Sequence, residues 1–103
     1  MSYYLVAKID FKNEDWWPEY LKGNTPILKK HGGRVLARTH NFDKLSPGDD
    51  KPTVMVIIEW PSKEAAKAFA TDPDYAPYEK LRLDGAAGGE AFMVLGEDEV
   101  NNL

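Results

Sequence analysis

The sequence predicts an α+β domain whose elements follow the order strand, helix, strand, strand, helix, strand. Four short segments have the apolar composition of strands, and two longer regions repeat apolar residues at helical spacing. Glycine and proline separate these segments. A length of 103 residues, with 43% hydrophobic and 29% charged residues, is typical of one globular domain. We assign this domain to residues 1–96 and an acidic tail to residues 97–103.

The first half of the chain predicts a strand, a helix and a strand. Tyr3 to Asp10 is rich in apolar and aromatic residues and is the first strand. Apolar residues then recur at helical spacing from Trp17 to His31, and Pro26 is expected to kink or restart this helix. Gly32-Gly33 can end the helix in the left-handed conformation, so that Arg34 to Arg38 forms the second strand.

The second half predicts a strand, two helical segments and a strand. Val54 to Trp60 is the most hydrophobic segment, which indicates a central strand buried on both faces. A helix follows from its N-cap at Ser62 to Asp72, and a shorter helical stretch carries Tyr75 to Arg82. The segment from Gly85 to Gly89 is expected to be a flexible connection, and Ala91 to Leu95 is the last strand.

This order is the ferredoxin-like βαββαβ arrangement, a four-stranded antiparallel sheet with the helices on one face. The second face of the sheet needs a cover, and 103 residues supply no third layer. Met55 and Ile57 make that second face apolar on the third strand. We therefore expect a homodimer that joins sheet to sheet as a dimeric α/β barrel.

Composition argues against several classes of function. The net charge of −4 and the scattered basic residues disfavour a nucleic-acid partner. Cysteine is absent, and His31 and His40 lack the spacing of a metal site. No apolar run reaches the roughly 18–20 residues of a membrane span, and the N-terminus does not resemble a signal peptide. We expect a cytoplasmic protein with no metal, cofactor or membrane partner.

Several segments along the chain form a pattern of moderate specificity. They are Tyr3–Asp10, His31-Gly32-Gly33-Arg34, Arg38, Glu59-Trp60-Pro61-Ser62, Ala65-Ala66, Tyr75 and Leu81-Arg82. Together they resemble the small bacterial domain-of-unknown-function family 1330, which belongs to the dimeric α/β barrel (ferredoxin-like) superfamily. The resemblance covers residues 3 to 96.

The resemblance implies the fold and a dimer, and it leaves the chemistry open. Trp60 stands where the family more often shows phenylalanine, and the loop from Thr39 to Thr53 is longer than usual. Related branches of the superfamily include cofactor-independent monooxygenases, haem-degrading enzymes and dye-decolourising peroxidases, so the fold does not identify a reaction.

His31 is the candidate catalytic residue, because histidine is the most frequent general acid or base in enzymes. It stands at the junction of the first helix and the second strand. The structural alternative is a cation that interacts with the negative end of the helix dipole.

Arg38 and Glu59 face each other on neighbouring strands if the long loop turns about Gly48-Asp49. A bidentate ion pair would follow. It would be either a structural salt bridge or an anion-binding arginine held in place by a carboxylate.

Tyr75, Tyr78 and Arg82 share one helical face at offsets 0, 3 and 7. They are candidates for the mouth of a pocket, where they would offer aromatic stacking and one guanidinium group. The alternative is ordinary packing or a dimer interface, in which tyrosine and arginine are enriched.

The leading hypothesis is a homodimer that binds a small organic molecule in a pocket between sheet and helices of each subunit. The ligand would bear, for example, a carboxylate that Arg38 or Arg82 could bind. A first alternative is a cofactor-independent monooxygenase-like enzyme that uses His31 as its base. A second is a purely structural dimerisation or stress-associated protein without a ligand.

Overall fold

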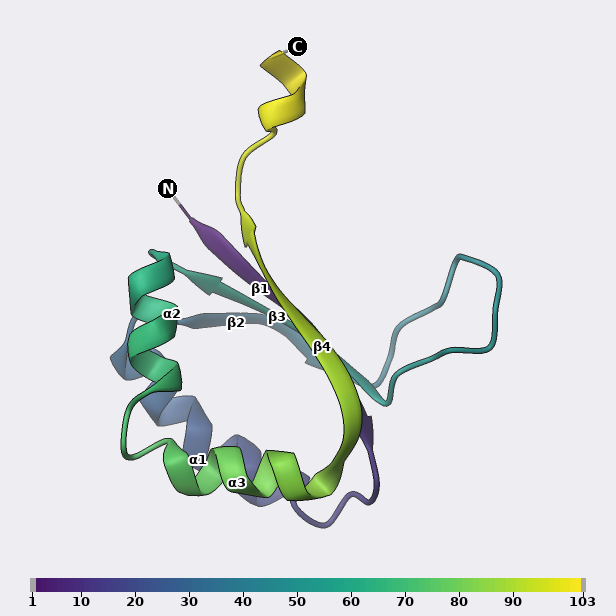
Figure 1. The fold of residues 1–103 in the computed structure, drawn as a ribbon, viewed down its shortest axis with the longest axis vertical. Coiled ribbons are helices and arrows are strands. Elements are labelled where there is room, and N and C mark those ends of the chain that lie inside the picture. Colours follow the sequence, from purple (N-terminus) through teal and green to yellow (C-terminus); the bar gives the residue numbers. More distant parts are fainter. Residues whose placement is uncertain (1, 103) are drawn as a thin grey trace.

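The computed structural model describes residues 2–102 and confirms the ferredoxin-like α+β fold (Figure 1). The elements are β1 (Tyr3–Phe11), α1 (Trp17–Lys30), β2 (Arg34–Thr39), β3 (Val54–Trp60), α2 (Lys63–Ala70), α3 (Ala76–Gly85), β4 (Ala86–Leu95) and the 3₁₀ helix η1 (Glu99–Asn102). The strands form one antiparallel sheet in the order β2-β3-β1-β4.

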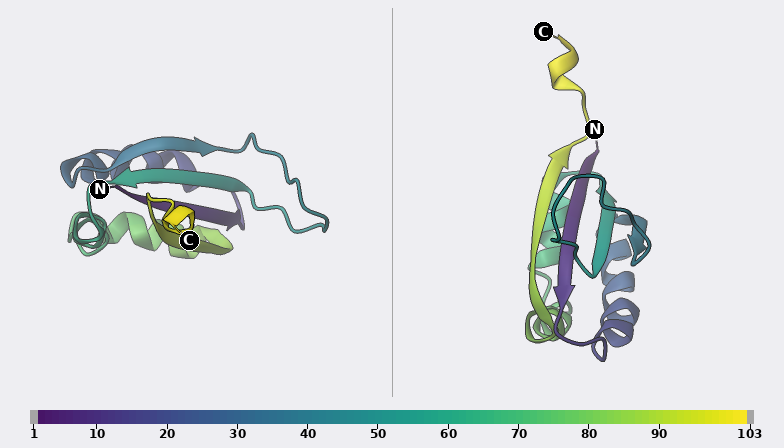
Figure 2. Two further views of the ribbon diagram at one scale, coloured as in Figure 1. Left: turned by 90° about the horizontal axis from the view of Figure 1, so that it is seen from above. Right: turned by 90° about the vertical axis from the view of Figure 1, so that its right-hand side faces the viewer.

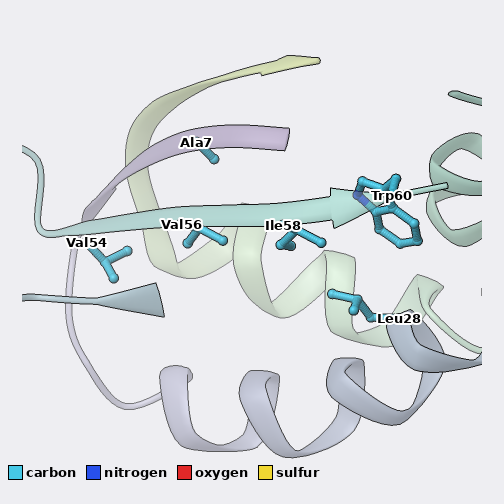
Figure 3. Packing of buried hydrophobic residues seen from close by; sticks show 6 residues of the cluster. All are labelled: Ala7, Leu28, Val54, Val56, Ile58 and Trp60. Carbon is cyan, nitrogen blue, oxygen red and sulfur yellow. The ribbon is translucent and has the colours of Figure 1, made fainter. Parts of the chain in front are cut away.

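Helices α1, α2 and α3 lie on one face of this sheet (Figures 1 and 2). As expected, β3 is a central strand, and its residues alternate between buried and partly exposed. The buried side, from Val54 to Trp60, packs with Ala7 of β1 and Leu28 of α1 in the main core (Figure 3). In the single chain only the helix-facing side of β3 is fully buried.

A second cluster joins the start of α1 to the start of α3, where Trp16, Tyr20 and Tyr75 are buried. The two helices can approach closely at Gly23 because glycine has no side chain. A Cβ atom at this position would collide with the ring of Tyr78. This contact brings the N-terminal half of α1 and the first turns of α3 together at one end of the molecule.

The predicted end of α1 at Gly32 and the predicted start of α2 at Ser62 are confirmed, whereas the path of α1 at Pro26 differs from the prediction. Gly32 ends α1 with φ +85°, and the hydroxyl of Ser62 accepts a hydrogen bond from the backbone N–H of Ala65 at 3.1 Å. Helix α1 continues through Pro26 as one element instead of restarting. Thr25, the residue before Pro26, donates from Oγ1 to the carbonyl of Leu21 at 2.6 Å.

The expectation of a flexible connection from Gly85 to Gly89 is wrong. Helix α3 ends at Gly85, and β4 begins at once and runs for ten residues along β1. The register pairs Ile9 with Gly89 and Asp10 with Gly88. Glycine and alanine have low strand propensity, but here their backbone groups pair with those of β1. This pairing outweighs the low propensity and makes the segment a strand.

The face of the sheet opposite the helices is uncovered in the single chain. One row of paired residues crosses all four strands on this face and is entirely apolar: Ala37, Ile57, Val6 and Phe92. The Phe92 side chain is 58% exposed. We call this row the open-face row. Within residues 2–102, no helix has the length and apolar character that crossing a membrane requires.

Candidate functional site

A cavity of about 550 Å³ lies between the sheet and the helices. This volume falls within the range of small-molecule sites. One side of the cavity is aromatic, and the opposite side, on β4, is built from residues with almost no side chain. The aromatic residues in its lining are Trp17, Tyr20, Trp60, Phe69 and Tyr75.

The β4 side of the cavity is the segment predicted to be a linker. All six residues from Ala86 to Ala91 line the cavity, and five of them are alanine or glycine. These small residues leave this side of the cavity without bulky side chains.

Arg38 reaches this cavity because β2 contains a bulge. Arg34 and Arg38 are four residues apart, so a regular strand would place both side chains on one face. The register shifts between Val35 and Ala37, which makes Leu36 an extra residue and reverses the alternation after it. Arg34 therefore lies on the open face, and Arg38 lies on the helix side, in the cavity lining.

The predicted pairing of Arg38 with Glu59 is wrong for the same reason. Arg38 pairs with Val56 in the ladder, and Arg34 pairs with Glu59. Arg34 donates to Glu59 Oε1 from Nη2 at 2.8 Å and from Nε at 3.1 Å. These hydrogen bonds hold the pKa of the Glu59 carboxyl below its usual range. Glu59 belongs to the open face and lies outside the cavity lining.

The Arg38 guanidinium group is half-buried and has only a neutral partner among the described residues, the Thr25 hydroxyl at 3.2 Å from Nη2. Within residues 2–102, no carboxylate forms an ion pair with it. Burial lowers the pKa of Arg38, which reflects the free-energy cost of holding its charge away from water.

Two tyrosine hydroxyl groups meet inside the cavity, and we call them the tyrosine pair. Tyr20 Oη and Tyr75 Oη lie 2.9 Å apart, and both side chains are buried. Burial and the neighbouring Tyr75 raise the pKa of Tyr20 well above its usual range, so its hydroxyl stays protonated. Arg82 interacts with the hydroxyl of Tyr75, and Asn24 interacts with that of Tyr20.

The structure thus brings together three of the predicted residues, Arg38, Tyr75 and Arg82, in one cavity lining. Tyr78 instead packs against Gly23 at the contact between α1 and α3, and it is not part of the lining.

His31 also lies outside the cavity lining. It caps the C-terminus of α1, and its Nε2 is 2.7 Å from Asp72 Oδ2. The same carboxylate oxygen accepts a hydrogen bond from Lys30 Nζ at 3.0 Å. Hydrogen bonds from His31, from the backbone N–H of Asp74 and from Lys30 hold the pKa of Asp72 far below its usual range.

The chain matches, over residues 2–96, a family described as a domain of unknown function, DUF1330. It belongs to the DUF1330 family. No curated protein matches this chain.

Solved structures share the fold of this DUF1330 protein at low sequence identity. A protein of unknown function from Rhodopseudomonas palustris, RPA0582, has a TM-score of 0.82 and 16% identity, and the match covers 94% of this chain and 83% of that one. SnoaB, a cofactor-independent oxygenase from Streptomyces nogalater, has a TM-score of 0.69 and 12% identity, with 96% of each chain covered. A dimeric ferredoxin-like protein of unknown function from Jannaschia sp. CCS1 has a TM-score of 0.62 and 14% identity, with 92% of this chain and 99% of that chain covered.

Two polar residues of the DUF1330 cavity, Tyr20 and Asn24, are not among the residues predicted for the site. Both lie within the helical stripe from Trp17 to His31. Asn24 falls four residues after Tyr20 and four before Leu28, so it shares their buried face. An asparagine on an apolar helix face is the signal that could have indicated a polar site.

Proposed function

We propose that this protein binds a small organic acid in the cavity, with Arg38 as the anchor for the carboxylate. The observation that carries the proposal is the guanidinium group of Arg38, half-buried in an apolar cavity without an anionic partner among residues 2–102. A cation in such surroundings is stabilised by a charge-assisted, often bidentate, hydrogen bond to a carboxylate. The lining contains two further cations, and both have partners. Arg82 interacts with Tyr75 and lies 4.0 Å from Glu79 Oε2. Lys8 Nζ lies 3.5 Å from Asp50 Oδ2.

A thermal-shift screen of aromatic and aliphatic carboxylic acids tests this function. A ligand that binds only the native state raises its stability, by about 2.7 kcal/mol at 100 times its Kd. We expect at least one class of acid to raise the Tm by several degrees. Arg38→Met, which keeps the apolar stem, should abolish the shift.

The matched control is Lys22→Met, which removes an exposed cation of α1 that does not line the cavity. It should leave the ligand-induced shift unchanged. A shift that persists in Arg38→Met would overturn the anchor. No shift with any acid would overturn the function and favour a purely structural or stress-associated protein.

The proposal includes a homodimer formed through the open-face row. Its support is an apolar row across all four strands with Phe92 largely exposed, together with the dimeric ferredoxin-like protein of the same fold. Burial of this face by a second copy would leave one cavity in each subunit, on the helix side of each sheet.

A cofactor-independent oxygenase is the second candidate, supported by the fold shared with SnoaB. In that case His31 would act as the base on a phenolic or enolisable substrate. His31 lies outside the cavity, and its Nε2 is hydrogen-bonded to Asp72. Substrate binding would therefore have to break the hydrogen bond between His31 and Asp72. Oxygen uptake with such a substrate, lost in His31→Ala and retained in His40→Ala, would support this candidate. An absence of oxygen uptake would leave binding as the function.

A further inference from the structure

We propose that the tyrosine pair is an oxygen-recognition subsite, so that the ligand is a planar aromatic acid with a second hydrogen-bond-accepting oxygen on its ring system. The proposal rests on the binding function proposed for this cavity. It adds a second point of recognition to the carboxylate anchor at Arg38.

The two hydroxyl groups of the tyrosine pair have more protons than their mutual hydrogen bond uses. The hydroxyls of Tyr20 and Tyr75 lie 2.9 Å apart, and their mutual hydrogen bond uses one of their two protons. Whichever tyrosine is the donor, the other keeps a proton that needs an acceptor. Among the described residues the structure gives no acceptor for this second proton.

The charged neighbour of the tyrosine pair cannot accept this proton. Arg82 interacts with Tyr75, and a guanidinium group has no acceptor atom. The hydrogen bond between Tyr20 and Tyr75 is the one that the structure gives to either hydroxyl among the described residues. The surroundings therefore favour an electron-rich oxygen at this point.

Burial of the tyrosine pair raises the free-energy cost of a hydroxyl proton without an acceptor. Tyr20 is 8% exposed and Tyr75 is 4% exposed, yet both line the cavity. A buried donor without a partner costs free energy, and an acceptor oxygen on a ligand would remove that cost.

The rings around the tyrosine pair favour a planar ligand. Trp17 stacks on Tyr20 with an interplanar angle of 16°, and the ring of Phe69 lies 4.4 Å from that of Tyr75. The segment from Ala86 to Ala91 lines the same cavity with small side chains. A flat ring can stack on the aromatic side chains and meets no bulky side chain on β4.

Three naphthoates test the subsite, because they share one ring system and one carboxylate. The first, 2-naphthoate, has no second oxygen, 6-methoxy-2-naphthoate has an acceptor only, and 6-hydroxy-2-naphthoate has a phenolic oxygen. We expect both oxygenated probes to bind more tightly than 2-naphthoate in fluorescence titrations, by roughly three- to tenfold for one net hydrogen bond. Equal affinity of all three probes would overturn the subsite.

Tyrosine-to-phenylalanine variants keep the rings and remove the hydroxyls. Tyr20→Phe and Tyr75→Phe each leave one hydroxyl with a free proton, so each should retain part of the preference. The double variant should lose the preference and still bind 2-naphthoate. Tyr78→Phe is the control, since this ring lies outside the cavity lining. A preference that survives in the double variant would overturn the proposal.

Arg38→Met separates this inference from the proposed function. If Arg38 binds the carboxylate, the variant weakens all three probes by a similar factor. If all probes bind with equal affinity and Arg38→Met weakens all of them, the subsite alone is rejected. If Arg38→Met leaves the affinities unchanged, the carboxylate anchor at Arg38 is rejected. A naphtholate absorption band of bound 6-hydroxy-2-naphthoate, at a pH where the phenol group of the free probe is protonated, would be the spectroscopic sign of hydrogen-bond donation to the phenolic oxygen.

Discussion

Arg34 and Arg38 have the same chemistry and stand on the same strand, yet they have different environments. Arg34 is exposed and pairs with Glu59, whereas Arg38 is half-buried and faces the cavity. The difference arises from one extra residue, Leu36, in the ladder between β2 and β3. A single insertion in a strand thus decides which arginine is available to an anion.

At the same scale, three of the six predicted site residues line the cavity, whereas the predicted partner of Arg38 is wrong. Arg38, Tyr75 and Arg82 were chosen as residues able to hold an anion or stack on a ligand, and they share one cavity. The register that decides their neighbours could not be predicted, because a bulge leaves no clear signal in the sequence and changes the face of every residue after it.

Asp72 gives a prediction for the pH dependence of stability. Its folded-state pKa is depressed mainly by the hydrogen bond from His31, so the carboxylate contributes stability that is fully present above its unfolded pKa of about 3.9. That stability is lost as the pH falls from this value toward the lower folded-state pKa. Asp72→Asn should therefore lower the Tm at neutral pH, and the difference from wild type should shrink below about pH 4.

The measurement is the Tm between pH 2 and pH 7, and the control is Asp74→Asn. Asp74 is exposed, with its Oδ2 only 3.9 Å from Lys30 Nζ, so its variant should follow the wild type closely. A constant Tm difference for Asp72→Asn across this range would show that ionisation of Asp72 beside His31 and Lys30 is not its source.

At the scale of elements, β4 links the fold to the cavity. The segment from Ala86 to Ala91 has the composition of a loop, but pairing with β1 makes it a strand. The sequence shows directly that the side chains here are small, but the loop-like composition predicted the wrong conformation. Strand formation in this segment depends on β1, a partner that is distant in sequence. The same small residues that misled the prediction keep the cavity open.

Filling this space should remove ligand binding with little effect on stability. Ala91 pairs with Ala7, whose side chain is in the core, so a larger residue at 91 would point toward the cavity. Because Ala91 is itself exposed, Ala91→Leu should change the free energy of unfolding by less than about 0.5 kcal/mol. It should abolish the Tm shift with aromatic acids, because its side chain would occupy the space of the ligand.

Chemical denaturation with and without ligand measures both effects. Val94→Ile, which enlarges a residue of β4 on the open face, is the control and should leave ligand binding intact. Unchanged ligand binding in Ala91→Leu would contradict the placement of the ligand against β4.

At the scale of the whole molecule, the single chain exposes more surface than its mass requires. A monomeric protein of 11.6 kDa is expected to expose about 5,800 Å², whereas this chain exposes 6910 Å². The loop between β2 and β3 and the C-terminal η1 project from the body (Figure 1). The sheet face opposite the helices also exposes Phe92 and Val94, and a standard interface buries about 800 Å² per partner.

The uncovered sheet face leads us to expect a dimer in solution. We expect light scattering to give twice the mass of the 11.6 kDa chain at micromolar concentration. Phe92→Lys places a charge in the open-face row, where a sheet-to-sheet interface would desolvate it, so this variant should be monomeric. Leu45→Lys changes a leucine that is 96% exposed in the loop between β2 and β3, and it should remain dimeric. A wild-type chain that stays monomeric at high concentration would remove the basis for the dimer and leave the apolar row exposed to water.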